Sequence, residues 1–417
     1  MEAGYVQKRP PLQRQVGWTL FGNVAYAACQ WAILIVFAKA VSPAMVGQFG
    51  LGLAISTPLL MFTNLQLRSL QATSAAQDLE FQDYLGFRLA STGLAFAVIL
   101  GLSVSIGTRP STALVIVVVG LAKCVESIAD TVYGQLQRSE MMRRIALSMV
   151  ARGGLSLVAT GAVVLMTRSM FWACVALTCA SSIVLFAYDL RVVAQPRLGL
   201  LPRWKAPQFR TIVRLGLPLG VASLFLALAI NIPRYMLEHS YGEGALGYFS
   251  ALGYPTAAFS ILLSAFGQAA TPRMAESYLT DRRKYWRIVM VLSAVPILTC
   301  LGLGLTILVF GPAILTHLYR SDYAAYFDVF LLLLLAGGLW ALASVLGYAA
   351  TASHRLKGQA PVSIAVCVAA IAAGALAIPT HGIRGAAFAS VSTAGAAIVL
   401  YSLILMGRSD HRTVENQ

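Results

Sequence analysis

Long apolar runs, separated by short polar stretches, follow one another along almost the whole chain. Each of twelve runs reaches the roughly 20 mostly apolar residues that a helix needs to cross a hydrocarbon core about 30 Å thick. None of them alternates between polar and apolar residues with a period of two, as the strands of a membrane barrel do. The runs predict helices at Val16–Val41, Ala44–Gln66, Tyr84–Gly107, Pro110–Gln135, Ile145–Thr167, Met170–Ala194, Ile212–Glu238, Gly244–Gln268, Tyr285–Gly311, Ala324–Ala350, Gln359–Pro379 and Gly385–Met406.

The composition supports this assignment to a membrane. Of the 417 residues, 58% are apolar and only 11% are charged. A water-soluble domain of this length could not cover so much apolar surface. The sequence therefore predicts an all-α polytopic membrane protein. Because an ionisable group in hydrocarbon is costly and is usually retained for function, charges inside the predicted helices are the candidate site residues.

The distribution of basic residues predicts the orientation of the helices. If the amino terminus is cytoplasmic, most Lys and Arg residues lie in cytoplasmic loops or near cytoplasmic helix ends. The opposite side carries only Lys39, Arg109, Arg168, Arg234, Arg320 and Arg384. This bias follows the positive-inside rule and places both termini in the cytoplasm. It also accounts for the formal net charge of +15 through contact with anionic membrane lipids, with no nucleic-acid partner.

The longest interruption between the predicted helices, 195–211, holds three prolines and several basic residues. It divides the chain into an amino-terminal six-helix bundle (1–194), a basic cytoplasmic linker (195–211) and a carboxy-terminal six-helix bundle (212–417). The second and eighth helices begin with similar residues, Gly47-Gln48-Phe49 and Gly247-Tyr248-Phe249. Because each half has an even number of helices, both halves enter the membrane from the same side, as in a parallel repeat. We therefore expect about twelve transmembrane helices in two pseudo-symmetric bundles around a central cavity.

The seventh and eighth helices carry the motifs of a known family. The seventh begins with Arg214-Leu215-Gly216-Leu217-Pro218-Leu219 and ends with Asn231-Ile232-Pro233-Arg234-Tyr235, and the eighth begins with Gly244-Ala245-Leu246-Gly247-Tyr248-Phe249-Ser250-Ala251. With these motifs, its twelve helices and its basic central linker, the chain resembles the polysaccharide transporter (Wzx-like) family of the multidrug/oligosaccharidyl-lipid/polysaccharide exporter superfamily. The resemblance covers nearly the whole chain.

This resemblance implies a flippase of the bacterial inner membrane. Its substrate would be an undecaprenyl-pyrophosphate-linked oligosaccharide, which it would move from the cytoplasmic to the periplasmic leaflet by alternating access. The product would serve the synthesis of exopolysaccharide, O-antigen or capsule, beside a polysaccharide polymerase and a chain-length regulator. The first, second, seventh and eighth helices would line the central cavity.

Two cations near the outer ends of the first and seventh helices are candidate ligands for the pyrophosphate. Arg234 follows Pro233 and lies one turn after Asn231, where a loosened helix frees backbone groups to face a cavity. Lys39 is its counterpart in the first half. An Arg fork donates two parallel hydrogen bonds to phosphate oxygens, and Lys supplies a compact charge. Alternatively, both side chains snorkel to the outer headgroups.

The middle of the fourth helix carries Lys123, Glu126 and Asp130. Offsets of three and four place them on one face, which must point to the bundle interior or to water. Either Lys123 and Glu126 form an internal salt bridge, or the cluster takes part in transport. In the second case Lys123 contacts the anionic headgroup, or Glu126 and Asp130 exchange protons or sodium to couple transport to an ion gradient.

Three further residues are candidates for contact with the substrate. Arg88 and Arg152 lie one or two turns inside the cytoplasmic ends of the third and fifth helices, where they either snorkel or receive the headgroup on the loading side. Asn23 contributes to a polar side of the first helix, which suits either sugar hydroxyls or hydrogen bonds between helices.

Other classes of function fit the sequence less well. An exporter of cationic drugs from the same superfamily requires an acidic, aromatic-lined cavity, whereas Lys39 and Arg234 favour an anionic substrate. A polytopic polymerase or ligase needs a sizeable outer loop, but the longest one here, around Thr316–Tyr323, is short. The cysteines lack metal-ligand spacing, and no nucleotide-binding loop or nucleophile motif occurs. The sequence therefore predicts no enzyme, no cofactor and no metal site.

Overall fold

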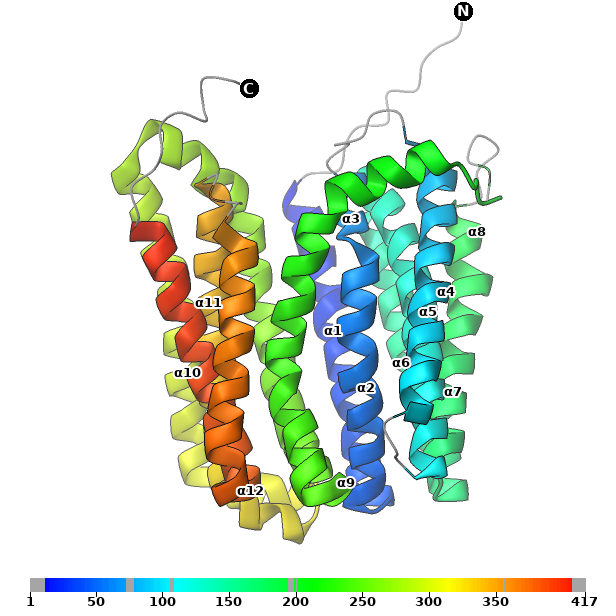
Figure 1. Ribbon diagram of the computed structural model, residues 1–417, viewed down its shortest axis with the longest axis vertical. Helices are drawn as coiled ribbons and strands as arrows, with labels where there is room; N and C mark the ends of the chain where they lie inside the picture. The colour runs from blue at the N-terminus through cyan, green and yellow to red at the C-terminus, as the bar shows by residue number, and fades with distance from the viewer. Residues whose placement is uncertain are drawn as a thin grey trace, which may run out of the picture. The chain divides into compact units, whose positions relative to one another are not determined.

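The computed structural model of the protein describes residues 12–72, 79–105, 109–193, 199, 201–353, 355 and 358–406. In these residues the regular structure is helical throughout (Figure 1), so the all-α prediction is confirmed. The elements are α1 (Leu12–Ala40), α2 (Pro43–Asn64), α3 (Leu67–Ala72), α4 (Phe81–Ser105), α5 (Pro110–Arg138), α6 (Met142–Thr167), α7 (Met170–Val184), the π-helical turn η1 (Leu185–Asp189), α8 (Leu190–Val193), α9 (Ala206–Thr280), α10 (Arg282–Leu318), the short 3₁₀ helix η2 (Ser321–Tyr326), α11 (Phe327–Ala352) and α12 (Gln359–Met406).

Two of these helices each contain a glycine that breaks the helical path. Gly242 in α9 has a φ of 76° and a ψ of 179°, and Gly382 in α12 has a φ of 56° and a ψ of −126°. A positive φ is strained for residues with a Cβ, so glycine suits both positions. Ten helices in the described residues are long and apolar enough to cross a membrane, and dividing α9 and α12 at these glycines gives twelve segments. These segments agree with the predicted helices.

The turn between α1 and α2 is determined by local sequence. Ser42 has an extended backbone, and its Oγ accepts a hydrogen bond from the amide of Met45 at 3.4 Å. Pro43 follows as the first residue of α2, where proline is favoured because it has no amide hydrogen to leave unpaired. Lys39 therefore lies in the last turn of α1, just before this break.

Contacts between Cα atoms divide the chain into two compact units. The first unit consists of Met1–Ala227 and Tyr241–Ala251, and the second of Leu228–Ser240 and Leu252–Gln417. Residues 212–227 thus group with the first unit, although the sequence placed them in the carboxy-terminal bundle. The domain boundaries at the linker therefore stay a prediction.

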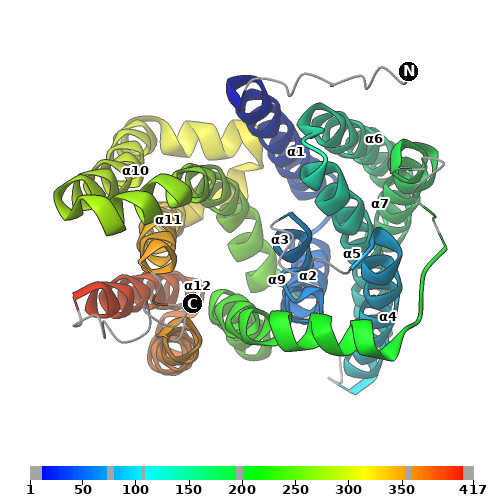
Figure 2. The same ribbon diagram turned by 90° about the horizontal axis from the view of Figure 1, so that it is seen from above.

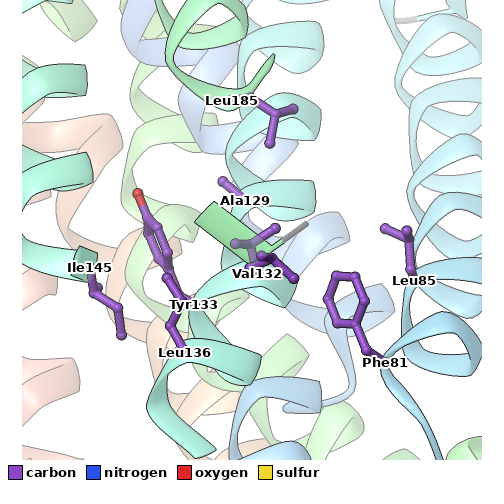
Figure 3. Packing of buried hydrophobic residues seen from close by; sticks show 9 residues of the cluster. Phe81, Leu85, Ala129, Val132, Tyr133, Leu136, Ile145 and Leu185 are labelled. Atoms are coloured by element: carbon purple, nitrogen blue, oxygen red, sulfur yellow. The ribbon is translucent and has the colours of Figure 1, made fainter. Parts of the chain in front are cut away.

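The central helix of the first unit is α5. It packs against α2, α3, α4 and α7, whereas α1 packs mainly against α6 (Figure 2). Neighbouring helices therefore cover α5 on several sides, and its polar residues Ser127 and Thr131 are buried. The apolar side chains that hold α5 against α4, α6 and η1 include Phe81, Leu85, Ala129, Val132, Tyr133, Leu136, Ile145 and Leu185 (Figure 3).

The second unit is assembled around α10, α11 and α12, which contact one another in sequence order. Tyr285, near the start of α10, is buried, and its hydroxyl donates a hydrogen bond to the backbone oxygen of Ala349 in α11 at 3.0 Å. Met274 of α9 and Leu405 of α12 belong to the same apolar cluster. This cluster joins the ends of four helices within the second unit.

Candidate functional site

Lys123, Glu126 and Asp130 line a cavity of about 320 Å³ within the first unit. Their offsets of three and four place them along one face of α5. Lys123 lies near the middle of the helix, about 20 Å from Pro110 at a rise of 1.5 Å per residue. The cavity is also lined by Tyr26 of α1, Thr57, Leu60, Met61 and Asn64 of α2, Arg68 of α3, Ser127 and Tyr133 of α5, and Met149 and Arg152 of α6.

The first ion pair of the cavity joins two residues of α5. The Nζ of Lys123 lies 2.7 Å from the Oε2 of Glu126, and the two side chains are 27% and 21% exposed. The hydroxyl of Tyr26 on α1 donates a hydrogen bond to the other carboxylate oxygen of Glu126 at 3.0 Å. The internal salt bridge, one of the alternatives predicted from the sequence, is therefore present. Both of its side chains line the cavity.

The second ion-paired group centres on Asp130, which lies between two arginines. The Nη1 of Arg68 is 3.3 Å from Oδ1 of this carboxylate, and the Nη2 of Arg88 is 3.6 Å from Oδ2. The side chains of Arg68 and Asp130 are 36% and 32% exposed, whereas that of Arg88 is fully buried. Asp130 therefore links the start of α4 and the short helix α3 to the central helix.

Arg88 is held by further hydrogen bonds to α2 and α5. Its Nε donates to the Oγ1 of Thr131 at 2.7 Å, and its Nη1 donates to the Oγ of Ser127 at 3.2 Å and to the side-chain oxygen of Asn64. A side chain that snorkels reaches the headgroups, and this one is enclosed between helices. The snorkelling interpretation of Arg88 is therefore wrong.

The third ion pair is buried at the cavity wall, where Arg152 is one of the lining residues. The Nη2 of Arg152 on α6 is 2.6 Å from the Oδ2 of Asp189, and both side chains are almost completely buried. The hydroxyl of Ser148 also donates a hydrogen bond to Asp189. Asp189 ends the π-helical turn η1, a kind of distortion that often re-aims a side chain at a functional site. Arg152 does not snorkel either, because its charge is paired inside the unit.

The ring of Tyr133 lies close to two of these guanidinium groups. The Cζ of Arg68 is 5.7 Å from the ring centroid, and the Cζ of Arg152 is 5.8 Å from it. Both distances are within the range of a cation–π interaction. The Tyr133 hydroxyl shares a hydrogen bond of 2.7 Å with Ser148, so the ring is fixed between the cavity and the buried pair.

The charges of this network do not cancel. Its cations are Arg68, Arg88, Lys123 and Arg152, and its carboxylates are Glu126, Asp130 and Asp189. Four cations and three carboxylates leave a formal charge of +1 in the interior of a membrane-spanning bundle. Paired charges reduce the cost of burial, while the remaining positive charge can attract an anion.

The other predicted site residues lie outside this cavity. Lys39 is exposed at the end of α1 in the first unit. Arg234 belongs to the second unit, where its Nη1 donates a hydrogen bond to the side-chain oxygen of buried Asn231 at 2.6 Å. Asn23 is half-buried, and its amide donates to the backbone oxygen of Thr19 at 2.8 Å within its own helix. A phosphate clamp formed by Lys39 and Arg234 stays a prediction.

Sequence reasoning missed two ionised residues of the network. Arg68 follows the predicted end of the second helix, so the sequence assigns it to the basic residues on the cytoplasmic side. Asp189 lies inside the predicted sixth helix, and its carboxylate within an apolar run was the signal that could have identified it. Tyr26 and Tyr133 offered no comparable signal, because aromatic residues are common in such helices.

Charged side chains also pair outside the cavity. Arg320 forms a two-point ion pair with Asp322 at 3.2 and 2.7 Å, and both side chains are more than a third exposed. Among the residues that the structure describes, no group of three or more His, Cys, Asp or Glu side chains could hold a metal ion.

Comparison with known proteins gives the fold and the family. Among solved structures, the chain is similar to one described as lipid II flippase MurJ in an inward closed conformation, with a TM-score of 0.72, 10% identity, and coverage of 95% of this chain and 88% of that one. It is also similar to an inward-facing multidrug resistance MATE family transporter of the MOP superfamily, with a TM-score of 0.66, 14% identity, and coverage of 96% of both chains. The chain therefore shares its fold with these two proteins.

Similarity in sequence extends over nearly the whole chain. The capsular polysaccharide biosynthesis protein CapF of Staphylococcus aureus is 22% identical over 392 residues, which cover 93% of this chain and 98% of that protein. Residues 12–278 match the family described as polysaccharide biosynthesis protein. The resemblance to the polysaccharide transporter family is thereby confirmed, and the chain belongs to the polysaccharide biosynthesis protein family.

Proposed function

We propose that this protein is a flippase that moves an undecaprenyl-pyrophosphate-linked oligosaccharide from the cytoplasmic to the periplasmic leaflet of the bacterial inner membrane. The observation that carries the proposal is the net cationic cavity of the first unit, found in a member of a polysaccharide biosynthesis family with a transporter fold. The product would serve the synthesis of a surface polysaccharide, in line with the capsular role named for the relative CapF.

The physical task of such a flippase is to move a charged headgroup past hydrocarbon. An unpaired charge there costs at least several kcal/mol. Lys123 and Arg68 on the cavity wall offer cations in place of water, and Asn64 and Thr57 offer hydrogen-bonding groups to sugar hydroxyls. The lipid tails remain in the bilayer, so no covalent bond is made or broken.

The charges support the proposed direction of transport and its coupling to ions. The excess of Lys and Arg in one set of loops favours cytoplasmic termini, and the lipid-linked unit would enter from that side. Glu126 and Asp130 line the cavity and are the groups that would exchange protons or sodium during the cycle. Arg234 and Lys39 would bind the pyrophosphate at another stage, and a polymerase and a chain-length regulator would receive the product.

The second candidate function is export of cationic drugs. It is favoured by the similarity in fold to the multidrug resistance MATE transporter. It requires an acidic cavity, whereas the cavity here has more cations than carboxylates. A polymerase or ligase fits less well, because the membrane-spanning fold is that of transporters.

The proposal is tested in a strain that lacks this gene. The strain is complemented with the wild type, Lys123→Ala or the control Lys284→Ala, which removes an exposed lysine at the start of α10. Undecaprenyl-linked oligosaccharide is then extracted, and its accessibility to a periplasmic probe is measured. We expect it to accumulate on the cytoplasmic face in the deletion and in Lys123→Ala, and to be exported normally with the wild type and Lys284→Ala.

Two outcomes would contradict the proposal. Normal exposure of the unpolymerised unit in the deletion strain would show that another step is affected. Normal lipid-linked oligosaccharide with a loss of cationic drug export would favour the multidrug exporter. Equal membrane levels of the variants, measured by immunoblotting, ensure that the comparison reports on transport.

A further inference from the structure

The cavity cations are already occupied by carboxylates of the protein itself. Along α5 and the adjoining α3, the charges follow the order Lys123, Glu126, Asp130 and Arg68, with a cation at each end and two carboxylates between them. From Lys123 to Asp130 the helix advances seven residues, or about 10 Å. We call these four residues the charged stripe. An anionic ligand that enters the cavity must therefore compete with Glu126 and Asp130.

The ion pairs of the network differ in how readily they can open. Arg152 and Asp189 are 4% and 0% exposed, so separating them would leave a buried charge without a partner. In the stripe, every charged side chain is between 21% and 36% exposed, and all four line the cavity. Ion pairs with this exposure are screened by solvent and contribute little to stability. The stripe is therefore the part of the network that a ligand can rearrange without unfolding the unit.

The cations at the two ends of the stripe have complementary properties. Arg68 is positioned by its Nε, which donates to the Oε1 of Gln137 at 2.9 Å, and one Nη faces Asp130. A guanidinium group can exchange one carboxylate for a phosphate while it keeps such a hydrogen bond. Lys123 is a compact charge on a flexible stem, which can turn from Glu126 to a ligand.

We propose that Lys123 and Arg68 form a two-point site for the diphosphate group of a lipid headgroup, and that Glu126 and Asp130 are resident counterions which the diphosphate displaces. The proposal rests on the proposed function and identifies how its substrate is held. Arg88 and Arg152, by contrast, are structural cations that keep the surrounding helices and the ring of Tyr133 in place.

Displacement of the two carboxylates would couple binding of the diphosphate to uptake of protons by the site. Glu126 is surrounded by Lys123, Arg152 and the hydroxyl of Tyr26, and Asp130 by Arg68 and Arg88. When a diphosphate binds Lys123 and Arg68, each carboxylate loses the cation of its ion pair. The negatively charged diphosphate then lies beside it. Each carboxylate is then stabilised by binding a proton from the solvent in the cavity. The bound state of the site should therefore hold more protons than the empty state.

The test measures binding and proton uptake with the full chain in lipid nanodiscs. Undecaprenyl pyrophosphate is titrated calorimetrically in buffers of different ionisation enthalpy, which gives the number of protons taken up per bound lipid. Inorganic pyrophosphate is titrated in parallel, to distinguish a lipid headgroup from a free anion. The variants are Lys123→Ala, Arg68→Ala, Glu126→Gln and Asp130→Asn, with Lys284→Ala as the exposed control.

We expect the wild type to bind the lipid with net proton uptake and to bind inorganic pyrophosphate more weakly. Lys123→Ala and Arg68→Ala should each weaken binding by at least about tenfold, since each leaves part of the diphosphate charge unpaired. Glu126→Gln and Asp130→Asn should strengthen binding by up to about fivefold, because they free a cation from a competing carboxylate, and each should reduce proton uptake. A merely structural role of these carboxylates would give the opposite sign.

Different results would overturn different parts of this inference. If the lipid binds without proton uptake, or if Glu126→Gln and Asp130→Asn weaken binding in folded protein, the carboxylates are not displaced. If inorganic pyrophosphate binds as tightly as the lipid, the site recognises a free anion. If the wild type binds neither, the cavity does not hold the substrate and the proposed function fails with it. Lys123→Arg, which keeps the charge, should bind when Lys123→Ala does not, and a melting curve for each variant identifies misfolding.

Discussion

Gly47 of α2 and Gly247 of α9 meet with backbone against backbone inside the first unit. A Cβ added to Gly47 would lie 1.9 Å from the backbone oxygen of Glu243, and one added to Gly247 would lie 1.8 Å from that of Pro43. These are the glycines of the similar tripeptides that open the second and eighth predicted helices. Small residues allow membrane helices to approach this closely, so the repeated glycine has a packing role as well as a symmetric position.

A side-chain network lies beside this contact. The amide of Gln48 donates hydrogen bonds to the Oε2 of Glu243 and to the Oγ1 of Thr112, each at 3.1 Å. The hydroxyl of Thr112 also donates to the other oxygen of Glu243. The network joins the starts of α2 and α5 to the part of α9 that follows Gly242, so the glycine contact and the hydrogen bonds depend on one another.

We expect Gly47→Ala to destabilise the first unit by about 1–3 kcal/mol, because the backbones must separate to admit a methyl group. The measurement is the melting temperature of the purified protein in detergent, followed by tryptophan fluorescence. The matched control is Gly244→Ala, since a Cβ there meets nothing within 4 Å. A control as destabilised as Gly47→Ala would contradict the argument from close approach.

The pair of Arg152 and Asp189 makes a second prediction about stability. Asp189→Ala leaves a buried guanidinium without its carboxylate, which should cost about 3–5 kcal/mol. The yield of monodisperse protein on size-exclusion chromatography and the melting temperature should both fall. Asp322→Ala is the control, because its partner Arg320 is 38% exposed and such a pair contributes about 0–1 kcal/mol.

A double replacement separates charge from packing at this position. Replacing both Arg152 and Asp189 by Leu removes the two charges together, so no unpaired charge stays buried. We expect the double variant to be more stable than Asp189→Ala alone. Equal instability of both variants would indicate that the shape of the pair, rather than its charge, holds α6 against η1.

The middle of the linker contacts α4 at Arg203, which predicts an effect on proteolysis. A Cβ on Gly86 would lie 2.1 Å from the backbone oxygen of Arg203, whose amide donates to the backbone oxygen of Gln82 at 3.1 Å. Gly86→Ala should therefore detach this segment, and trypsin should cleave after Arg203 several times faster. Gly93→Ala lies on the same helix with nothing within 4 Å of its Cβ, so its cleavage rate should match that of the wild type.

Much of the fold could be predicted from the sequence because membrane helices are determined by local composition. The twelve apolar runs correspond to helical segments, and the two breaks inside α9 and α12 fall at glycines between predicted helices. The grouping of residues 212–227 with the first unit could not be predicted. It depends on tertiary contacts such as Gly216 against Leu65, where an added Cβ would lie 2.7 Å from the Leu65 side chain.

The candidate site was predictable along one helix and not between helices. Offsets of three and four placed Lys123, Glu126 and Asp130 on one face, and the structure places that face on a cavity. The partners of these residues come from other helices, so spacing along the chain carries no information about them. Arg88 illustrates the difference, since its distance from a helix end suggests snorkelling, whereas its hydrogen bonds to α2 and α5 hold it inside.

The ring of Tyr133 gives the last prediction, because it lies near both Arg68 and Arg152 at 5.7 and 5.8 Å. Tyr133→Phe keeps the ring and loses only the hydrogen bond to Ser148, whereas Tyr133→Leu loses the ring face as well. Two cation–π contacts of about 0.5–2 kcal/mol each would be absent in the Leu variant. We therefore expect binding of undecaprenyl pyrophosphate to fall by about tenfold or more in Tyr133→Leu and to change little in Tyr133→Phe. If the Phe variant binds as weakly as the Leu variant, the hydroxyl rather than the ring face positions the cavity arginines.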